Sequence, residues 1–357
     1  MRLPSLLGKE LAWGRHRLLA LVFVFVVLPA SFAYGTLAFQ TVLPTDAPVA
    51  VVPAGDATTH DDVVITRGAV TPFSDPVTYR SRDAAFEAMS RERVYAVVTV
   101  PANITNASEP AVFDVYVSGS VVPYHQASKA VVGVMNIVLR DRLPPEMDVR
   151  VERHVVGVER SLSQYLVPTF ALVLAMLVAL AYLPYNLATE RAALDRLRVE
   201  SSLSAVLAWK LAFFAALALV PVAVFQVFAA RFGYGLSLAS VGALAVYLLT
   251  FVSLGAVGLS VTLLTRFSTW GRLVNVLVML FLLLFSGLLY PAGFFSPLRR
   301  ELVRSLPTYY SVVALRGYVL RDAGTGFFAS WIAGLAAVTV ASLLVLRGAV
   351  AAYERRS

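Results

Sequence analysis

Side chains suited to catalysis or metal binding are scattered along this sequence rather than grouped. His60, His125 and His154 have no neighbouring ligand at metal-binding spacing, and the adjacent Asp61 and Asp62 are typical of a surface turn. No Gly-x-Ser-x-Gly element marks a serine nucleophile, and no Gly-x-x-x-x-Gly-Lys-Ser/Thr element marks a P-loop for ATP. The sequence therefore predicts a protein that is not an enzyme and that carries no cofactor, metal or ATPase site of its own.

The composition indicates that the bilayer is the solvent of most of the chain. Of the 357 residues, 58% are hydrophobic and 15% are charged, with a mean hydropathy of +0.73. A helix needs about 20 mostly apolar residues to cross the hydrocarbon core. Six segments reach that length: Leu18 to Phe39, Leu166 to Leu187, Leu203 to Ala230, Leu236 to Leu264, Leu273 to Phe295 and Phe327 to Leu346. The expected fold is a polytopic α-helical membrane protein with six transmembrane helices.

One long stretch, residues 40–160, contains no such segment. Its charges are dense and its apolar runs short, as in a water-soluble domain of ordinary size. It carries 11 basic and 15 acidic residues, so the chain's net charge of +8 leaves +12 on the membrane part. Cytoplasmic loops of membrane proteins collect Lys and Arg, so we expect a lipid membrane and no nucleic acid as the partner of this charge.

We expect the inserted domain to have an α+β fold. The patterns predict strands at Val49 to Pro53, Tyr95 to Pro101, Val112 to Val117 and Val149 to Val156, and helices at Ser81 to Ser90 and Tyr124 to Arg142. Ser81 is the expected N-cap of the first helix. Asn103 and Asn106 begin glycosylation sequons, which matter only in a host that glycosylates them.

The basic residues before the first span predict the topology. Arg2, Lys9, Arg15 and Arg17 place the N-terminus in the cytoplasm, and an even number of spans places the C-terminus there too. The chain is then a multi-pass protein of the cytoplasmic membrane with residues 40–160 outside. One loop disagrees, because five arginines lie between the fifth and sixth spans, on the external side: Arg299, Arg300, Arg304, Arg316 and Arg321.

Residues 1–39 divide into two predicted helices. Leucines recur at helical spacing before the first span, at Leu3, Leu6, Leu7 and Leu11. This pattern favours an amphipathic helix along the inner membrane surface over a frayed tail. The first transmembrane helix follows it and is too long for a cleaved signal peptide. Residues 161–357 then supply the other five transmembrane helices.

A proline-interrupted series follows the fifth span. Ser286-Gly287 and Pro291 are followed by Leu306-Pro307-Thr308-Tyr309-Tyr310 and then Arg316. Since Pro291, Pro297 and Pro307 prevent one continuous helix, residues 291–326 are expected to form short re-entrant or interfacial pieces under the external surface. Their arginines would then face water or lipid headgroups. The series resembles one found in ABC type-2 transporter permeases with a large external domain after the first helix. The motif residues occur in the same order in both.

A second match lies between the second and third spans. Glu190-Arg191, Leu194-Asp195-Arg196-Leu197 and a closing Trp209-Lys210 resemble the family's cytoplasmic coupling loop, here residues 188–203. Ala208-Trp209 stands where the family has a glycine, and Glu200-Ser201 where it has Ser-Pro. A weaker third match, Ser81 to Pro101, is similar to the helix-then-strand unit of the external domain.

The resemblance implies a permease subunit of an ABC exporter. In that family two permease copies, identical or related, pair around the transport path, and two separate ATPase subunits bind ATP and Mg²⁺. Glu190, Arg191, Leu194, Asp195, Arg196 and Leu197 would couple the chain to the ATPase. The substrate is not readable from these residues.

Two other functions stay open on the residues alone. A secondary transporter or channel is disfavoured because the spans hold no Asp or Glu relay and no inverted repeat. A non-transporting receptor or assembly protein would share the domain layout. Polar residues within the spans, namely Asn186, Gln226, Ser253, Asn275 and Ser286, would line a path or, as we favour, serve helix packing.

Overall fold

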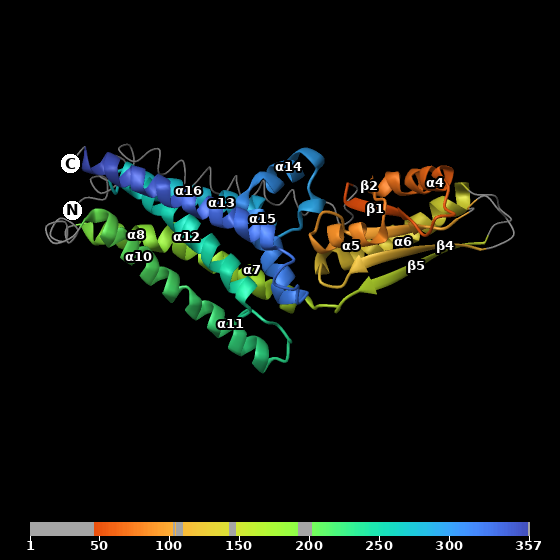
Figure 1. Cartoon of the computed structure of the whole chain (residues 1–357), viewed down its shortest axis with the longest axis horizontal. Coiled ribbons are helices and arrows are strands. Elements are labelled where there is room, and N and C mark those ends of the chain that lie inside the picture. Colours follow the sequence, from red (N-terminus) through yellow and green to blue (C-terminus); the bar gives the residue numbers. More distant parts are fainter. Residues whose placement is uncertain (1–45, 103, 105–109, 143–147, 192–201, 356–357) are drawn as a thin grey trace, which may run out of the picture.

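A computed structural model describes residues 46–102, 104, 110–142, 148–191 and 202–355. Residues 1–39, with the predicted interfacial and first transmembrane helices, lie outside the described residues, as do Asn103 and Asn106. The described part is elongated, with a sheet domain at one end and a bundle of helices at the other (Figure 1).

The sheet domain is built on five strands in the order β2-β1-β3-β4-β5, in which only β3 and β4 pair antiparallel. The strands are β1 (Pro48–Pro53), β2 (Asp75–Thr78), β3 (Ala96–Val100), β4 (Ala111–Ser118) and β5 (Val149–Val156). The connecting helices are α4 (His60–Val70), the short 3₁₀ turn η3 (Thr71–Phe73), α5 (Arg82–Ser90) and α6 (Val122–Arg142). All four predicted strands and both predicted helices are present, with ends within two residues of the predicted ones.

Helices cover both faces of this sheet. Alternate residues of β1 point to opposite faces, so Val49 and Val51 pack with α4 and α6 while Ala50 and Val52 pack with α5. Parallel strands need crossover connections, and the helices supply them. The domain is therefore a mixed α/β layer structure, and the expected α+β class is corrected.

The sequence patterns missed β2 and α4. The expected surface turn at Asp61 and Asp62 is wrong, because Asp62 is buried at the third position of α4. There its carboxylate accepts from the Thr59 backbone N–H while the Thr59 hydroxyl accepts from the Asp62 N–H, which forms a capping box. Asp62 Oδ1 also accepts the Ile104 N–H at 3.0 Å. The sequence around Asp62 has no clear apolar stripe at helical spacing, so the pattern did not predict α4.

The bundle follows the sheet domain in the chain. Its segments are α7 (Leu162–Leu177), the π-helix η4 (Val178–Tyr182), α8 (Leu183–Thr189), α10 (Leu203–Leu217), α11 (Leu219–Arg231), α12 (Val241–Leu264), α13 (Thr269–Phe285), η5 (Ala292–Phe294), α14 (Pro297–Ser305), α15 (Pro307–Leu320) and α16 (Ala329–Glu354). Within the described ranges, four continuous helical stretches are long and apolar enough to cross a membrane: Leu162–Thr189, Leu203–Arg231, Val241–Leu264 and Ala329–Glu354.

The predicted fifth span ends earlier than the sequence suggested. The apolar run continues to Phe295, but α13 stops at Phe285 and has 17 residues. Gly287 has a φ of +74°, which turns the chain out of the helix, and Pro291 follows. Hydrophobicity alone does not mark this end, since most of the apolar residues beyond it, such as Leu288 and Phe294, are buried in the protein.

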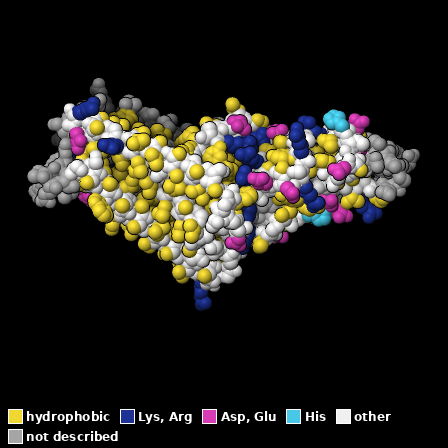
Figure 2. Space-filling view, in the orientation of Figure 1, with side chains coloured by type: hydrophobic (Ala, Val, Ile, Leu, Met, Phe, Trp, Pro, Cys, Tyr) yellow, Lys and Arg dark blue, Asp and Glu magenta, His cyan; other side chains and the backbone are white. Residues whose placement is uncertain are grey.

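The sheet domain and the bundle differ in the side chains that cover their surfaces. Hydrophobic side chains cover the helices, whereas charged side chains are spread over the sheet domain (Figure 2). Large apolar residues are exposed on α10 and α11, among them Trp209, Phe213 and Val227. An apolar surface of this extent needs lipid or another protein over it, which agrees with a membrane protein.

Helix α12 is the central element of the bundle and packs closely against η4. A Cβ atom at Gly258 would lie 2.8 Å from the Ala179 carbonyl oxygen and 3.0 Å from Cγ of Pro184. The contact is with backbone and a rigid ring, so neighbouring atoms have little room to move. Glycine at this position permits the close helix approach that small residues give membrane bundles.

We predict that Gly258→Ala destabilises the bundle by about 1–3 kcal/mol, the usual cost of overpacking. The measurement is thermal unfolding of the full chain in detergent. Gly348→Ala on α16 is the matched control, because an added Cβ there meets no described atom within 4 Å. Equal melting temperatures for the two variants would contradict the close contact.

Candidate functional site at the domain junction

The chain turns sharply after α13, and two residues of the predicted motif, Ser286 and Gly287, form this turn. Ser286 is fully buried, and Gly287 takes the left-handed conformation that directs the Leu288 carbonyl into the protein. A Cβ on Gly287 would lie 3.6 Å from Cδ2 of Tyr309, so Tyr309 packs beside the turn. Pro291 follows at the start of η5. The structure thus brings these four motif residues together.

Arg316 on α15 lies under this turn. Its side chain is 2% exposed, and its Nη2 donates to the Leu288 carbonyl oxygen at 2.6 Å. The guanidinium also lies 4.4 Å from the ring centroid of Tyr165 on α7. Pro307 opens α15 at its first turn, where a missing N–H costs no helical bond. Arg316 therefore ties α7, α15 and the turn after α13.

The counter-ion of Arg316 comes from the sheet domain. Glu92 follows α5 and is 2% exposed, with Oε2 3.6 Å from Arg316 Nη1 and Oε1 3.4 Å from Arg321 Nη1. Glu92 has a φ of +53°, a conformation that costs energy for a residue with a Cβ. Burial lowers the pKa of the Arg321 guanidinium, and the Glu92 carboxylate opposes that shift. One carboxylate thus joins two cations of the bundle to the domain.

An aromatic contact supports the same junction. Phe294 of η5 packs into the core of the sheet domain, with its ring centroid 6.3 Å from Tyr95 and 6.0 Å from Tyr124. The Gly293 N–H donates to the Tyr95 hydroxyl at 3.0 Å. A Cβ at Gly293 would lie only 2.1 Å from the Tyr95 ring, so this approach requires glycine.

The expectation that the arginines of residues 291–326 face water or lipid headgroups is wrong for three of them. Arg300 is 3% exposed and pairs with Asp75 of β2 at 3.1 Å, while Arg316 and Arg321 hold Glu92. The physical reason is the sheet domain itself, whose acidic side chains and carbonyl groups lie against this segment. These partners lie more than 200 residues from the arginines in sequence, so local patterns could not identify them.

The described residues that flank the predicted coupling loop lie at the opposite end of the bundle. Leu194, Asp195, Arg196 and Leu197 lie outside the described residues, whereas Glu190 and Arg191 are described. Glu190 Oε2 accepts from Lys210 Nζ at 2.6 Å, so a salt bridge joins the end of α8 to α10. The Arg191 guanidinium lies 5.6 Å from the ring centroid of Phe267, in the connection between α12 and α13.

A group of side chains in the sheet domain corrects the prediction for one histidine. His154 Nε2 lies 2.8 Å from Asp114 Oδ1 and 4.0 Å from Glu152 Oε2. These three could hold a metal ion by spacing, and they come from adjacent strands β4 and β5. The sequence could not bring Asp114 to His154, since 40 residues separate them. The imidazole also stacks on Tyr116 at 5.0 Å.

Three of the polar residues predicted within the spans serve helix packing. Asn275 Nδ2 donates to the Gly258 carbonyl at 3.1 Å, and Ser253 bonds Ser342 at 3.0 Å. Gln226 bonds the Leu236 carbonyl and the Leu238 N–H ahead of α12. Asn186 Oδ1 and Ser286 Oγ are buried without a hydrogen-bond partner among the described residues.

Sequence reasoning missed Glu92 and Arg160. Glu92 stands in a charged stretch, Arg91-Glu92-Arg93, that is typical of a solvated turn. Arg160 donates through Nε to the Leu320 carbonyl at 3.0 Å and through Nη1 to the Tyr234 carbonyl at 3.1 Å. The available signals were the place of Arg160 at the predicted domain boundary and that of Glu92 between a predicted helix and a predicted strand.

We predict that Glu92→Gln destabilises the full chain by about 3–5 kcal/mol, because the buried Arg316 and the partly buried Arg321 lose their counter-ion. Thermal unfolding in detergent measures this effect. Glu87→Gln is the control, since Glu87 pairs with Arg91 on the exposed face of α5 and the loss should be small. Matching melting temperatures would show that Glu92 does not bind the domain to the bundle.

Comparisons with known proteins agree with the membrane architecture. The family model described as ABC-2 family transporter protein matches residues 16–347, nearly the whole chain. Comparisons with curated proteins and with solved structures find no match. The matched range includes the sheet domain, the helices and the junction between them. The chain therefore belongs to the ABC-2 family of transporter proteins, as a membrane-embedded permease component.

Proposed function

We propose that this chain is the transmembrane subunit of an ABC exporter, which moves a substrate out across the cytoplasmic membrane when separate ATPase subunits hydrolyse ATP. The observation that carries the proposal is the match of residues 16–347 to the ABC-2 transporter family, and the structural feature that bears on coupling is the salt bridge between Glu190 and Lys210. It closes the segment that resembles a coupling loop, at the end of the bundle away from the sheet domain (Figure 1). ATP and Mg²⁺ bind the partner and not this chain.

The ends of several connections meet beside this loop. Phe267 contacts both the Arg191 guanidinium and the ring of Tyr353 near the end of α16. A partner that binds residues 188–203 would therefore lie against α8, α10, the connection after α12 and the end of α16. A push at one such surface moves several helices together, as a coupling interface requires.

The contacts of α12 offer a route for that movement. Gly258 packs on η4, just before α8, while Thr250 bonds Ser311 of α15 at 2.7 Å. Helix α15 carries Arg316, which binds Glu92 of the sheet domain. A tilt of α8 and α10 on ATP binding would pass through α12 to α15 and then to the domain.

The pairing of the junction arginines supports an external sheet domain. Arg300, Arg316 and Arg321 counted against this topology as unpaired positive charges. Since they bind Asp75 and Glu92, they no longer act as a free cytoplasmic signal. We place both termini in the cytoplasm, and two copies of the chain, identical or related, around the transport path. Lipid or the second copy would cover the apolar surfaces of α10 and α11.

The topology predicts which side each end of the molecule faces. Because the chain has no cysteine, a single cysteine can be introduced without background. Val158→Cys, at a side chain that is 62% exposed in the sheet domain, should react with an impermeant maleimide in intact cells. Ser357→Cys should react only after the cells are opened. The reverse pattern would contradict the orientation.

The coupling loop predicts a charge-swap rescue. Glu190→Lys and Lys210→Glu should each leave the chain in the membrane but lower ATPase co-purification and export, because like charges separate α8 from α10. The double variant should recover most of both activities, since it restores the pair.

Lys129→Glu, an exposed change on α6, is the control for net charge. Leu194→Asp and Arg196→Glu extend the test into the loop and should remove co-purification of the ATPase at normal abundance. Full export by every single variant would show that the loop is only a connector.

A further inference from the structure

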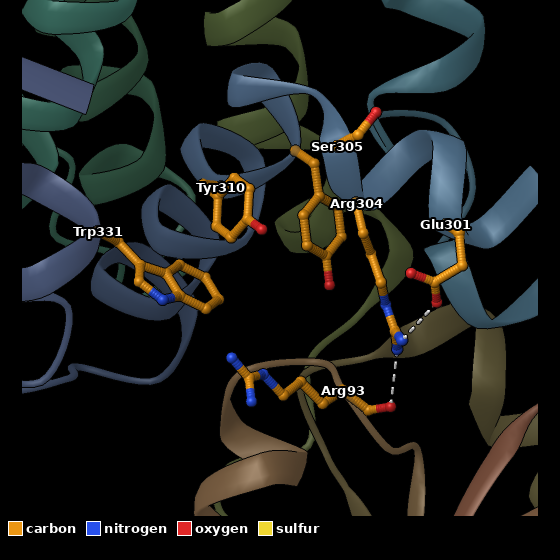
Figure 3. A pocket seen from close by; sticks show the side chains of 7 residues that line it. Arg93, Glu301, Arg304, Ser305, Tyr310 and Trp331 are labelled. Atoms are coloured by element: carbon orange, nitrogen blue, oxygen red, sulfur yellow. Dashed lines mark hydrogen bonds and ion pairs between the residues drawn. The ribbon is translucent and has the colours of Figure 1, made fainter. Parts of the chain in front are cut away.

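A cavity of about 340 Å³ lies between the sheet domain and the helices that follow α13. Two of its walls come from the turn before β3 and from α14, and the others from the starts of α15 and α16. Figure 3 shows the side chains from these elements around a shared space. Its lining residues are Arg93, Glu301, Arg304, Ser305, Tyr309, Tyr310 and Trp331.

One end of this cavity is positively charged. Arg304 bonds the Arg93 carbonyl at 3.1 Å and pairs with Glu301 at 3.4 Å, so it is held in place. Arg93 is an exposed residue, and its guanidinium points into the space between Arg304 and Trp331 (Figure 3). With one carboxylate and two guanidinium groups, the lining carries a net charge of +1.

The cavity also contains an unpartnered buried hydroxyl. Tyr309 is 3% exposed, and the Arg304 guanidinium lies beside its hydroxyl oxygen, but the hydroxyl proton has no acceptor within the described part of the chain. A buried polar group without a partner costs free energy unless a ligand or water satisfies it. Tyr309 is thus placed to donate to an anionic oxygen that Arg93 and Arg304 attract.

An apolar groove of about 320 Å³ adjoins this charged end. The two share Ser305, Tyr310 and Trp331, and the rings of Tyr310 and Trp331 meet at right angles 5.0 Å apart. From there the groove follows Gly334, Leu335 and Val338 along α16. The seven helical rises from Trp331 to Val338 span about 10 Å.

The position of the groove on α16 relates it to the bilayer. Helix α16 is one of the four stretches able to span a membrane, and Trp331 stands in its first turn. Tryptophan and tyrosine concentrate at the level of lipid headgroups. The charged end therefore lies at headgroup depth and the groove runs toward the hydrocarbon.

We propose that this combined site binds an anionic membrane lipid, with its acidic headgroup at Arg93, Arg304 and Tyr309 and one acyl chain along Gly334, Leu335 and Val338. A soluble anion would satisfy the guanidinium groups but leave the groove empty. A neutral lipid would fill the groove but leave the Arg93 charge without a partner. The site is independent of the proposed export, since it needs neither nucleotide nor ATPase.

The test uses full-length chain in detergent without nucleotide. Phosphatidylglycerol and phosphatidylcholine with the same brominated acyl chains are titrated at low mole fraction, and quenching of Trp331 is followed. The chain has four tryptophans, so Trp331→Phe identifies the contribution of Trp331. We expect phosphatidylglycerol to quench this contribution at about tenfold lower mole fraction than phosphatidylcholine.

Two variants test the two ends of the site. Arg93→Gln should remove the preference for phosphatidylglycerol, while Arg67→Gln, an exposed arginine on α4, should keep it. Gly334→Leu should fill the groove and abolish specific quenching, while Gly348→Leu on the same helix should not. An added Cβ meets no described atom within 4 Å at either glycine, so both variants should fold.

Three results would overturn the proposal. Equal quenching by the two lipids would exclude headgroup recognition. Quenching unchanged by Gly334→Leu would place the lipid outside this groove. Displacement of the brominated lipid by glycerol 3-phosphate at equal concentration would reduce the site to one for a soluble anion.

Discussion

The buried carboxylate of Glu92 is the interaction on which the architecture of this permease depends. It is the counter-ion of two arginines that belong to the bundle, and it comes from a domain inserted far earlier in the chain. A buried guanidinium without a partner is strongly unfavourable, so the buried Arg316 and the partly buried Arg321 keep their counter-ion only while the domain stays docked. The left-handed conformation of Glu92 is a cost that the ion pairs offset.

That constraint makes the sheet domain and the bundle one mechanical unit at their junction. Arg316 also holds the turn after α13 through the Leu288 carbonyl, and Phe294 adds an apolar contact in the domain core. The short helices between α13 and α16 therefore serve as a connector between domain and spans. Movements that begin at the Glu190–Lys210 end would reach the domain through side chains that are already paired.

Local patterns were enough to predict much of this protein. Apolar runs of membrane length, strand alternation and a Ser81 cap depend on neighbours in sequence. Among the described residues the structure has four of the predicted spans, the four predicted strands and the helix capped by Ser81. Pro297 and Pro307 mark helix starts because proline lacks an N–H that an interior position would need. Capping of α4 by Thr59 was also local, but no apolar stripe drew attention to it.

The sequence by itself determined the membrane setting and four of the five strands of the sheet domain, since hydrophobicity and backbone preference act over a few residues. Only the tertiary structure decided the partners of the junction arginines, the early end of α13 and the meeting of Asp114 with His154. Arg300 and Asp75 are 225 residues apart. The sequence does not distinguish an exposed, unpaired arginine from a buried arginine that pairs with a distant carboxylate. Long-range ion pairs are specified by the packed fold, because a charge that loses its water on burial is stable only beside a counter-ion.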